Sequence, residues 1–179
     1  FIFKIFLLII FIFLLYTQKS FSEELDKWYN IGPPFSSDKF EVIMDPNNNE
    51  ILYLVGDSVF KSDNKGKSWS PIMTTEEGIW NLSVYQLSID PFDTNTIYIG
   101  TRHNGVWKSV TSGSSWCAIN TNLPEQIDEI RSIVVDKNNS SVLYMSLKGK
   151  SEEIECPIYR SDDAGETWHR YCNGIQNPY

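Results

Sequence analysis

The chain has 179 residues, of which 41% are hydrophobic, 14% aromatic and 21% charged. This composition excludes the disordered and collagen-like classes. The net charge of −8 argues against nucleic acid and anionic membrane surfaces as partners, since both require clustered Lys and Arg. The length would suit one domain, but the chain begins with Phe1 and no closing element follows Gln176, so we expect a fragment of a longer protein.

An apolar segment opens the chain. Residues 1–16 are almost wholly apolar, and small residues follow at Ser20 and Ser22. This pattern is typical of a secretory signal peptide cleaved after Ser22. The alternative is an uncleaved anchor, although the apolar run is shorter than the ~20 residues that span a bilayer. Residues 1–22 are therefore predicted as a signal peptide or N-terminal anchor of an extracytoplasmic (secreted or periplasmic) protein. Membrane contact is expected only through this segment, if it stays uncleaved.

A repeat organises the rest of the chain. Three segments each place an apolar, an aromatic and a basic residue before a Ser, then a Gly four residues later, then a hydroxyl residue and Trp; they are residues 59–69, 106–116 and 158–168. Upstream of them, Asp45, Asp90 and Asp136 recur after 45 and then 46 residues. Periods of ~40–50 residues with four short strands each are typical of β-propeller blades.

Alternating apolar residues and turn residues predict four strands in every repeat. In chain order these are 40–44, 51–55, 58–62 and 68–72, then 84–89, 96–101, 105–109 and 115–120, then 130–135, 142–147, 157–161 and 167–171. The predicted fold is an all-β propeller of which about three four-stranded blades are present, approximately residues 40–82, 83–128 and 129–179. Three blades form an open arc, because closed propellers take about 4–8 blades.

The third copy of the repeat carries a complete motif. Ser161, Asp163, Gly165, Thr167 and Trp168 match Ser-x-Asp-x-Gly-x-Thr-Trp. The repeats therefore resemble the Asp-box (BNR) family, which occurs in sialidases, xyloglucanase-type glycoside hydrolases, sortilin-type receptors and photosystem assembly factors. The Asp-Pro pairs before the second strands are most similar to the xyloglucanase and sortilin-like branch. The other two copies depart from the motif and consist of Ser62, Asn64, Gly66 and Trp69, and of Ser109, Thr111, Gly113 and Trp116.

The chemistry of the motif predicts a structural role. A short acceptor such as Asp163 can accept backbone N–H groups across a turn, and glycine supplies a positive φ without steric cost. The Trp ring is expected to pack under the turn or between blades. The resemblance implies the same, since these boxes generally lie away from the catalytic pocket in the family. None of the boxes is therefore read as a catalytic site.

Residues 23–39 form an N-terminal segment with one notable stretch. Trp28–Ile31 resembles the predicted fourth strands that begin at Trp69 and Trp116, but no box precedes it. Our hypothesis is that residues 27–31 close the ring by completing the last blade. The alternative is an N-terminal strand that caps the first blade.

Three cysteines are present, and no Cys-x-x-Cys pair indicates a metal or redox site. An oxidising compartment permits one disulfide. If Ser161 pairs with Thr167 across the third hairpin, Cys156 lies opposite Cys172, within the Cα range of ~4.4–6.8 Å that a disulfide needs. We therefore predict a Cys156–Cys172 bridge that leaves Cys117 free, and we expect neither a metal nor a cofactor.

The sequence contains no recognisable catalytic motif: no Gly-x-Ser-x-Gly, no His-Glu-x-x-His and no phosphate-binding glycine loop. His103 is interpreted as a turn residue and His169 as a surface residue. Nothing selects one catalytic acid among the loop carboxylates Asp57, Glu76, Glu77, Asp128 and Glu129, so the catalytic residues stay unknown. The segments that join the repeats bring acids and an aromatic residue to one end of the blades and predict a candidate ligand face made of Glu76, Trp80, Arg102 and Asp128. The alternative for Trp80, which we favour, is a buried position between blades.

The sequence favours an exported propeller that serves as a binding or interaction scaffold for a glycan or protein. One alternative is a sialidase- or xyloglucanase-like glycoside hydrolase whose catalytic residues lie largely in further blades. Another is a sortilin-like, peptide-binding receptor domain. This stretch shows repeats without a catalytic motif, so the enzyme assignment stays open and leans towards a non-catalytic role.

Overall fold

The structure is a computed structural model that describes residues 40–73, 83–149 and 157–173. The chain divides into two compact units, residues 1–31 and 32–179, and every feature below belongs to the second. The predicted signal segment and the predicted closing strand lie outside the described residues. Within the described ranges, no helix has the length and apolar character needed to cross a bilayer.

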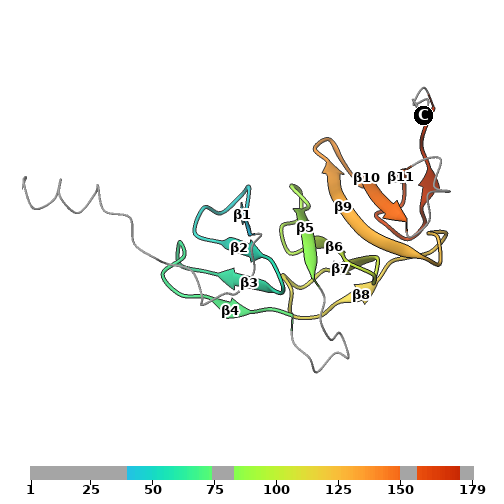
Figure 1. Ribbon diagram of the computed structural model, residues 1–179. Coiled ribbons are helices and arrows are strands. Elements are labelled where there is room, and N and C mark those ends of the chain that lie inside the picture. Colours follow the sequence, from blue (N-terminus) through green and yellow to red (C-terminus); the bar gives the residue numbers. More distant parts are fainter. Residues whose placement is uncertain (1–39, 74–82, 150–156, 174–179) are drawn as a thin grey trace, which may run out of the picture. The chain divides into compact units, whose positions relative to one another are not determined.

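In the described residues, twelve strands form three antiparallel sheets, one for each repeat (Figure 1). The first sheet has the order β1-β2-β3-β4, the second β5-β6-β7-β8 and the third β12-β11-β10-β9. The strand bounds are β1 Glu41–Met44, β2 Leu52–Val55, β3 Val59–Ser62, β4 Ser70–Pro71, β5 Val84–Ile89, β6 Ile97–Thr101, β7 Val106–Ser109, β8 Cys117–Ala118, β9 Ile127–Asp136, β10 Asn139–Gly149, β11 Ile158–Ser161 and β12 His169–Arg170. The predicted all-β fold with three four-stranded blades is confirmed.

The outermost strands are shorter than predicted. Only two residues pair in each of β4, β8 and β12, and all six of these residues are exposed. The physical reason lies just before each strand, where a backbone N–H donates to a side chain of the box. Ser68 N donates to Asn64 Oδ1, Ser115 N to Thr111 Oγ1 and Thr167 N to Asp163 Oδ1, each at 2.9 Å. Very short edge strands also limit unwanted pairing with other chains.

The two inner strands of the third sheet are longer than predicted. β9 and β10 pair from Asn139↔Asp136 to Gly149↔Ile127, with register shifts that interrupt the ladder at three places. Such irregularities let a long strand bend while it keeps pairing.

The apolar core lies between the sheets. One cluster joins the first and second sheets, and it contains Tyr53, Val55, Val59, Met73, Val84, Leu87, Ile97 and Ile99. A second cluster joins the second and third sheets and contains Tyr98, Val106, Ile119, Ile127, Ile130, Ile133, Leu143, Met145, Leu147, Tyr159 and Trp168. All five residues of β6 are buried, as expected for a strand whose sheet is covered on both faces. The second blade therefore supplies apolar side chains to both clusters.

One face of the first blade differs from its equivalents. Val42, Leu87 and Ile133 each stand three residues before the repeated Asp. Leu87 is 3% exposed and Ile133 1% exposed, whereas Val42 is 61% exposed. Met44, on the same face, is 56% exposed. The surface that the second and third blades bury against a preceding blade is therefore open in the first.

This contrast predicts unequal costs for equivalent truncations. Leu87→Ala should lower the free energy of unfolding by about 2–5 kcal/mol, because it leaves a cavity in a packed cluster. Val42→Ala, at the equivalent open position, should change it by less than about 0.5 kcal/mol. Chemical denaturation of the two variants followed by tryptophan fluorescence measures both values, and equal losses would show that the first blade's face is covered.

Candidate functional site

The two ends of the strands differ in chemistry. At one end lie the box hairpins, which we define as residues 62–69, 109–116 and 161–168, and they contact the loops between the first two strands of each sheet. Lys65 N donates to Glu50 O at 2.9 Å, and Ser112 N donates to Asn95 O at 2.8 Å; in the third sheet Ala164 N donates to Ser141 O, near the beginning of β10, at 2.9 Å. At the other end lie the β6–β7 turn and the beginnings of β5 and β9, because antiparallel strands reverse direction at each turn.

Each box hairpin is held by hydrogen bonds within itself. In the third, Ser161 Oγ accepts from Gly165 N at 2.8 Å and donates to Asp163 Oδ1 at 2.7 Å. Thr167 donates to Asp163 twice, from Oγ1 at 2.6 Å and from N at 2.9 Å. The donors, with Thr167 first, lower the pKa of Asp163 to about 2. The carboxylate is therefore fully occupied by the turn.

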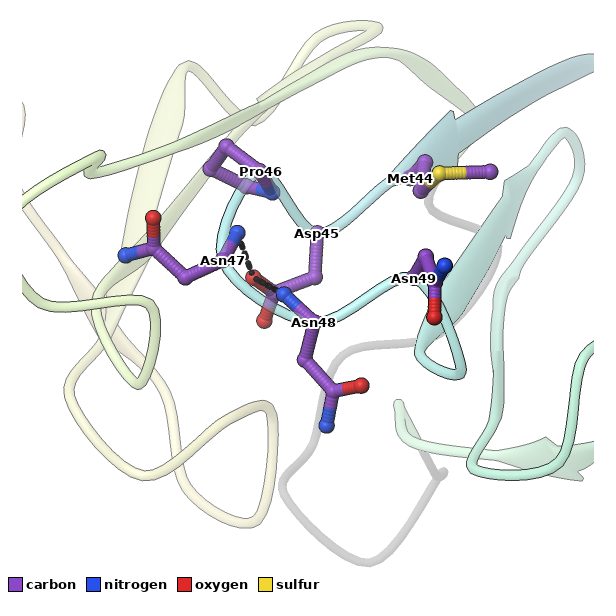
Figure 2. A pocket seen from close by; sticks show the side chains of 6 residues that line it. All are labelled: Met44, Asp45, Pro46, Asn47, Asn48 and Asn49. Atoms are coloured by element: carbon purple, nitrogen blue, oxygen red, sulfur yellow. Dashed lines mark hydrogen bonds between the residues drawn. The ribbon is translucent and has the colours of Figure 1, made fainter.

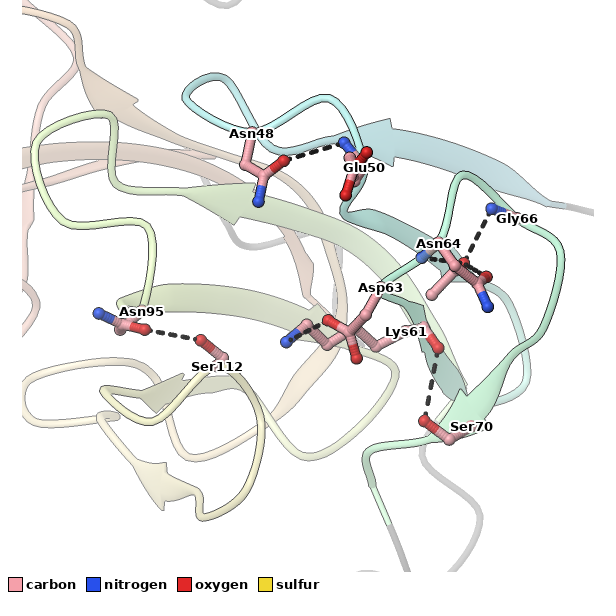
Figure 3. Close-up of polar contacts among 10 residues, drawn as sticks. Asn48, Glu50, Lys61, Asp63, Asn64, Gly66, Ser70, Asn95 and Ser112 are labelled. Atoms are coloured by element: carbon pink, nitrogen blue, oxygen red, sulfur yellow. Dashed lines mark hydrogen bonds and ion pairs between the residues drawn. The ribbon is translucent and has the colours of Figure 1, made fainter.

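The first box hairpin repeats this arrangement with an amide. Ser62 Oγ accepts from Gly66 N at 2.8 Å, and Asn64 Oδ1 accepts from Ser68 N at 2.9 Å. Figure 3 shows Asn64 and Gly66 at this turn. It also shows Ser70, on β4, beside Lys61 on β3. Asn64 Nδ2 donates to Ser68 Oγ at 2.8 Å. An amide therefore replaces the carboxylate without loss of the turn.

The box tryptophans connect neighbouring blades. Trp116 Nε1 donates to Ile72 O at 3.1 Å, and Trp168 Nε1 donates to Ile119 O at 2.8 Å. A Cβ on Gly165, which has a φ of +92°, would lie 2.5 Å from Ile119 Cδ1. Only glycine permits both this backbone conformation and this close approach. The box end of the strands is thus built for contact between blades.

A shallow pocket of about 500 Å³ also lies at the box end, in the loop after β1 (Figure 2). It is lined by Met44, Asp45, Pro46, Asn47, Asn48 and Asn49. Asp45 is buried, and its Oδ1 accepts from the backbone N of Asn47 at 2.8 Å and of Asn48 at 3.1 Å. Its carboxylate therefore serves the loop. No group of three or more His, Cys, Asp or Glu side chains in the described part of the chain could hold a metal ion.

The opposite end contains a charged cluster around the β6–β7 turn. Arg102 N donates to Ser83 O at 2.8 Å, and His103 N donates to Asp128 O at 2.9 Å. Arg102 also forms an isolated antiparallel bridge with Glu129. We define the turn cluster by its six charged or titratable members, which are Arg102, His103, Asp128, Glu129, Arg131 and Lys148.

Hydrogen bonds fix the backbone of this turn. Thr101 Oγ1 donates to Gly105 O at 2.7 Å. The carbonyl of Asn104 accepts from Trp107 Nε1 at 3.2 Å and from Asn120 Nδ2 at 3.3 Å. His103 has a φ of 69°, a conformation that costs energy for a residue other than glycine and persists only where its surroundings impose it. The turn is therefore pre-organised.

Ion pairs cross the turn cluster. Asp128 Oδ2 lies 3.1 Å from Lys148 Nζ, and Asp128 Oδ1 lies 3.5 Å from His103 Nδ1. Lys148, which donates a hydrogen bond to Asp128, is the main cause that lowers the pKa of this carboxyl, and the charges of His103 and Arg102 lower it further. Glu129 Oε2 is 3.3 Å from Arg131 Nε. Asp128 therefore remains ionised at neutral pH.

The structure brings together part of the predicted ligand face. Arg102 and Asp128 meet in the turn cluster, whereas Glu76 and Trp80 lie outside the described residues. His103, interpreted from sequence as a turn residue, does occupy the turn and also pairs with Asp128. Lys148 was not singled out from the sequence. The signal for it would have been the pairing of β9 with β10, which places Lys148 opposite Glu129.

The structure describes only one of the two cysteines of the predicted disulfide. Cys117 is a free, exposed cysteine, and Cys172 is disulfide-bonded. Cys156 lies outside the described residues, so its pairing with Cys172 stays a prediction.

Comparison with known families places the chain. The family model Sortilin-Vps10, described as sortilin, neurotensin receptor 3, matches residues 27–178. The chain belongs to the Sortilin-Vps10 family. This assignment and the relatives described next confirm the predicted resemblance to the xyloglucanase and sortilin-like branch.

Curated relatives of this Sortilin-Vps10 chain include two xyloglucanases. Xyloglucanase Xgh74A of Acetivibrio thermocellus is 27% identical over 135 residues, which cover 62% of this chain and 16% of the relative. A xyloglucanase of Hypocrea jecorina is 24% identical over 175 residues, which cover 79% of this chain and 20% of the relative. The chain therefore spans no more than a fifth of the length of these relatives.

Solved structures share the fold. The GH74 xyloglucanase from Xanthomonas campestris has a TM-score of 0.61 at 20% identity, over 78% of this chain and 24% of that one. YCF48 bound to D1 peptide has a TM-score of 0.52 at 19% identity, over 77% of this chain and 45% of that one. At these identities the likeness concerns the fold alone.

The low pKa of Asp163 predicts how acid affects the third box hairpin. A carboxylate whose pKa is depressed by folding adds stability above its unfolded pKa of about 3.9 and loses it as pH falls. Asp163→Asn gives the third box hairpin the residue type that Asn64 supplies in the first. The stability of this variant should differ most from that of the unmodified protein above about pH 4, and the two stabilities should converge towards pH 2. Thermal unfolding of both proteins between pH 7 and pH 2 measures this, and a difference independent of pH would contradict it.

The β6–β7 turn should tolerate little change at its glycine. Gly105 has a φ of +70°, and a Cβ there would lie 2.2 Å from Asn120 Oδ1. Gly105→Ala should cost about 1–3 kcal/mol of stability. Asn104→Ala is the matched control, because the turn uses the backbone carbonyl of Asn104, and it should change stability by less than about 0.5 kcal/mol. Denaturant unfolding compares the two, and a neutral Gly105→Ala would show that the turn is not fixed.

Proposed function

We propose that the chain is part of an exported propeller that binds a glycan or protein ligand at the end of the blades formed by the turn cluster. The observation that carries the proposal is the β6–β7 turn, whose backbone is fixed while its charged side chains remain at the surface. Because a rigid turn loses little freedom when a ligand arrives, more of the contact energy appears as affinity.

The distribution of polar groups between the two ends supports the same choice. At the box end, Ser161 and Asp163 bond within their own hairpin and Trp168 bonds the preceding blade. At the other end, His103 is 48% exposed and Lys148 51% exposed. The motif side chains of the box end are therefore engaged within the fold, whereas the turn cluster presents half-exposed charged side chains on a fixed turn.

The relatives support both ligand classes. Two of the curated relatives are named xyloglucanases, and one structural neighbour is described as bound to a peptide. Export is proposed from the apolar N-terminal segment, whose residues 1–16 are followed by small residues at Ser20 and Ser22. The ligand would then be extracytoplasmic.

A glycoside hydrolase is the second candidate, since relatives carry that activity in their names. Such enzymes need a carboxylic acid whose pKa is raised so that it can protonate the leaving group. Asp128 has the opposite tendency, because Lys148 lowers its pKa. Asp128 is therefore suited to hold a cation, and catalytic acids of the complete protein would be other residues.

The test is a binding experiment on the full chain. Xyloglucan oligosaccharides, acidic oligosaccharides and a set of peptides are titrated while the amide NMR spectrum is recorded. We expect a ligand to shift the signals of residues 101–105 and 128–131, and we expect Arg102→Ala to weaken its binding. Lys67→Ala, an exposed cation in the first box hairpin, is the matched control and should bind normally.

Two results would contradict the proposal. One is the absence of binding to every glycan and peptide tested. The other is binding whose shifts fall on the box hairpins and that Lys67→Ala weakens as much as Arg102→Ala. A reducing-sugar assay on xyloglucan separates the two candidates, since release of new chain ends would favour the hydrolase.

A further inference from the structure

We propose that the turn cluster recognises the carboxylate of an acidic glycan, a chain that contains uronic acid. This inference rests on the proposed function and narrows its ligand class. It is carried by the exposure of the cluster's charges, by the guanidinium of Arg102, and by the hydrogen-bond acceptors beside it.

The cluster is a local excess of positive charge on an acidic chain. The whole chain has a net charge of −8, whereas the cluster combines Arg102, Arg131 and Lys148 with two carboxylates and one histidine. A spot whose sign is opposite to that of the surrounding surface attracts and orients a ligand of the complementary charge. The ligand that this spot favours is an anion.

The exposure of the side chains strengthens the positive character. Arg131 is 59% exposed and Lys148 51% exposed, whereas their partners Glu129 and Asp128 are 16% and 18% exposed. The carboxylates thus lie beneath and hold the cations, and the cations face solvent. A ligand that approaches this surface meets positive charge first.

Arg102 is the cation most available to a ligand. Its backbone is fixed by the bond from Arg102 N to Ser83 O and by the bridge to Glu129. Its side chain is exposed and forms no hydrogen bond or ion pair with any residue in the described ranges. A guanidinium can donate two parallel hydrogen bonds to one carboxylate, and such charge-assisted pairs are the strongest hydrogen bonds in proteins.

The acceptors beside Arg102 favour a sugar over an acidic peptide. Asp128 and Glu129 keep part of their surface accessible, and the side chain of Asn104 is exposed. Sugar hydroxyls can donate to these oxygens while a uronate carboxylate accepts from Arg102. The side chains of a peptide rich in Asp or Glu only accept hydrogen bonds when they are ionised, so they cannot donate to Asp128 and Glu129 as sugar hydroxyls can.

The experiment compares one glycan with and without its charge. The full chain is titrated by calorimetry with an oligogalacturonate and with the methyl ester of the same oligomer, which keeps the rings and linkages. We expect the acid to bind at least about tenfold more tightly than the ester, because a hydrogen bond to a charged group exceeds a neutral one. The preference should shrink as ionic strength rises.

Variants assign the preference to the cluster. Arg102→Gln should reduce the affinity for the acid at least about tenfold and leave that for the ester nearly unchanged. Lys148→Gln is a second variant in case the first unfolds, and thermal unfolding of each checks the fold. Lys67→Gln, in the first box hairpin, removes the same charge elsewhere and should keep the preference for the acid.

The outcomes separate this inference from the proposed function. Equal binding of acid and ester, or a preference that survives both Arg102→Gln and Lys148→Gln, overturns the acidic-glycan inference but leaves a glycan-binding propeller. Binding of an oligoglutamate peptide and of neither sugar also overturns it and leaves a protein-binding propeller. Failure to bind sugars and peptides alike removes both.

Discussion

The bond between a tryptophan indole and a carbonyl of the preceding blade sets the register of the blades. Trp116 reaches Ile72 O and Trp168 reaches Ile119 O. Apolar clusters join neighbouring sheets, and burial alone would hold the sheets together at many offsets. The indole bond selects one offset, because a buried N–H left without an acceptor is costly. The box hairpin places the indole where this acceptor lies.

Because the box hairpin positions the indole, the polar side chains of its motif form hydrogen bonds within the hairpin. Ser161, Asp163 and Thr167 satisfy one another, and Gly165 allows the turn to approach Ile119. The first box hairpin achieves the same turn with Asn64, so the geometry of the acceptor matters more than its charge. The opposite end of the strands differs, because hydrogen bonds fix the β6–β7 turn while the side chains of Arg102 and His103 reach solvent.

The blades could be predicted from the sequence because each repeat carries the same turn residues and the same alternation of apolar residues. The recurring Gly and Trp indicated the box hairpins, and the recurring Asp indicated the turn before the second strand of each repeat. The alternation of apolar residues indicated the inner strands. The outer strands were predicted too long. The motif indicated that a short acceptor such as Asp163 accepts backbone N–H groups, but not that the donors are Ser68 and Thr167 at the predicted start of these strands. Sequence analysis placed Arg102 and Asp128 on one candidate ligand face but did not include Lys148. The position of Lys148 beside Asp128 depends on the long pairing of β10 with β9. Contacts between distant segments leave no local pattern in the chain.

The turn cluster spans two blades, so its geometry depends on how these blades pack against each other. Arg102 and His103 belong to the second blade, whereas Asp128 and Lys148 belong to the third. Gly100 brings the blades close, since a Cβ there would lie 2.4 Å from Ile130 Cγ2. A shift between these blades would separate His103 from Asp128 even if every strand stayed folded. The indole of Trp168, at the far end of the same interface, therefore helps to hold together charges that it does not touch.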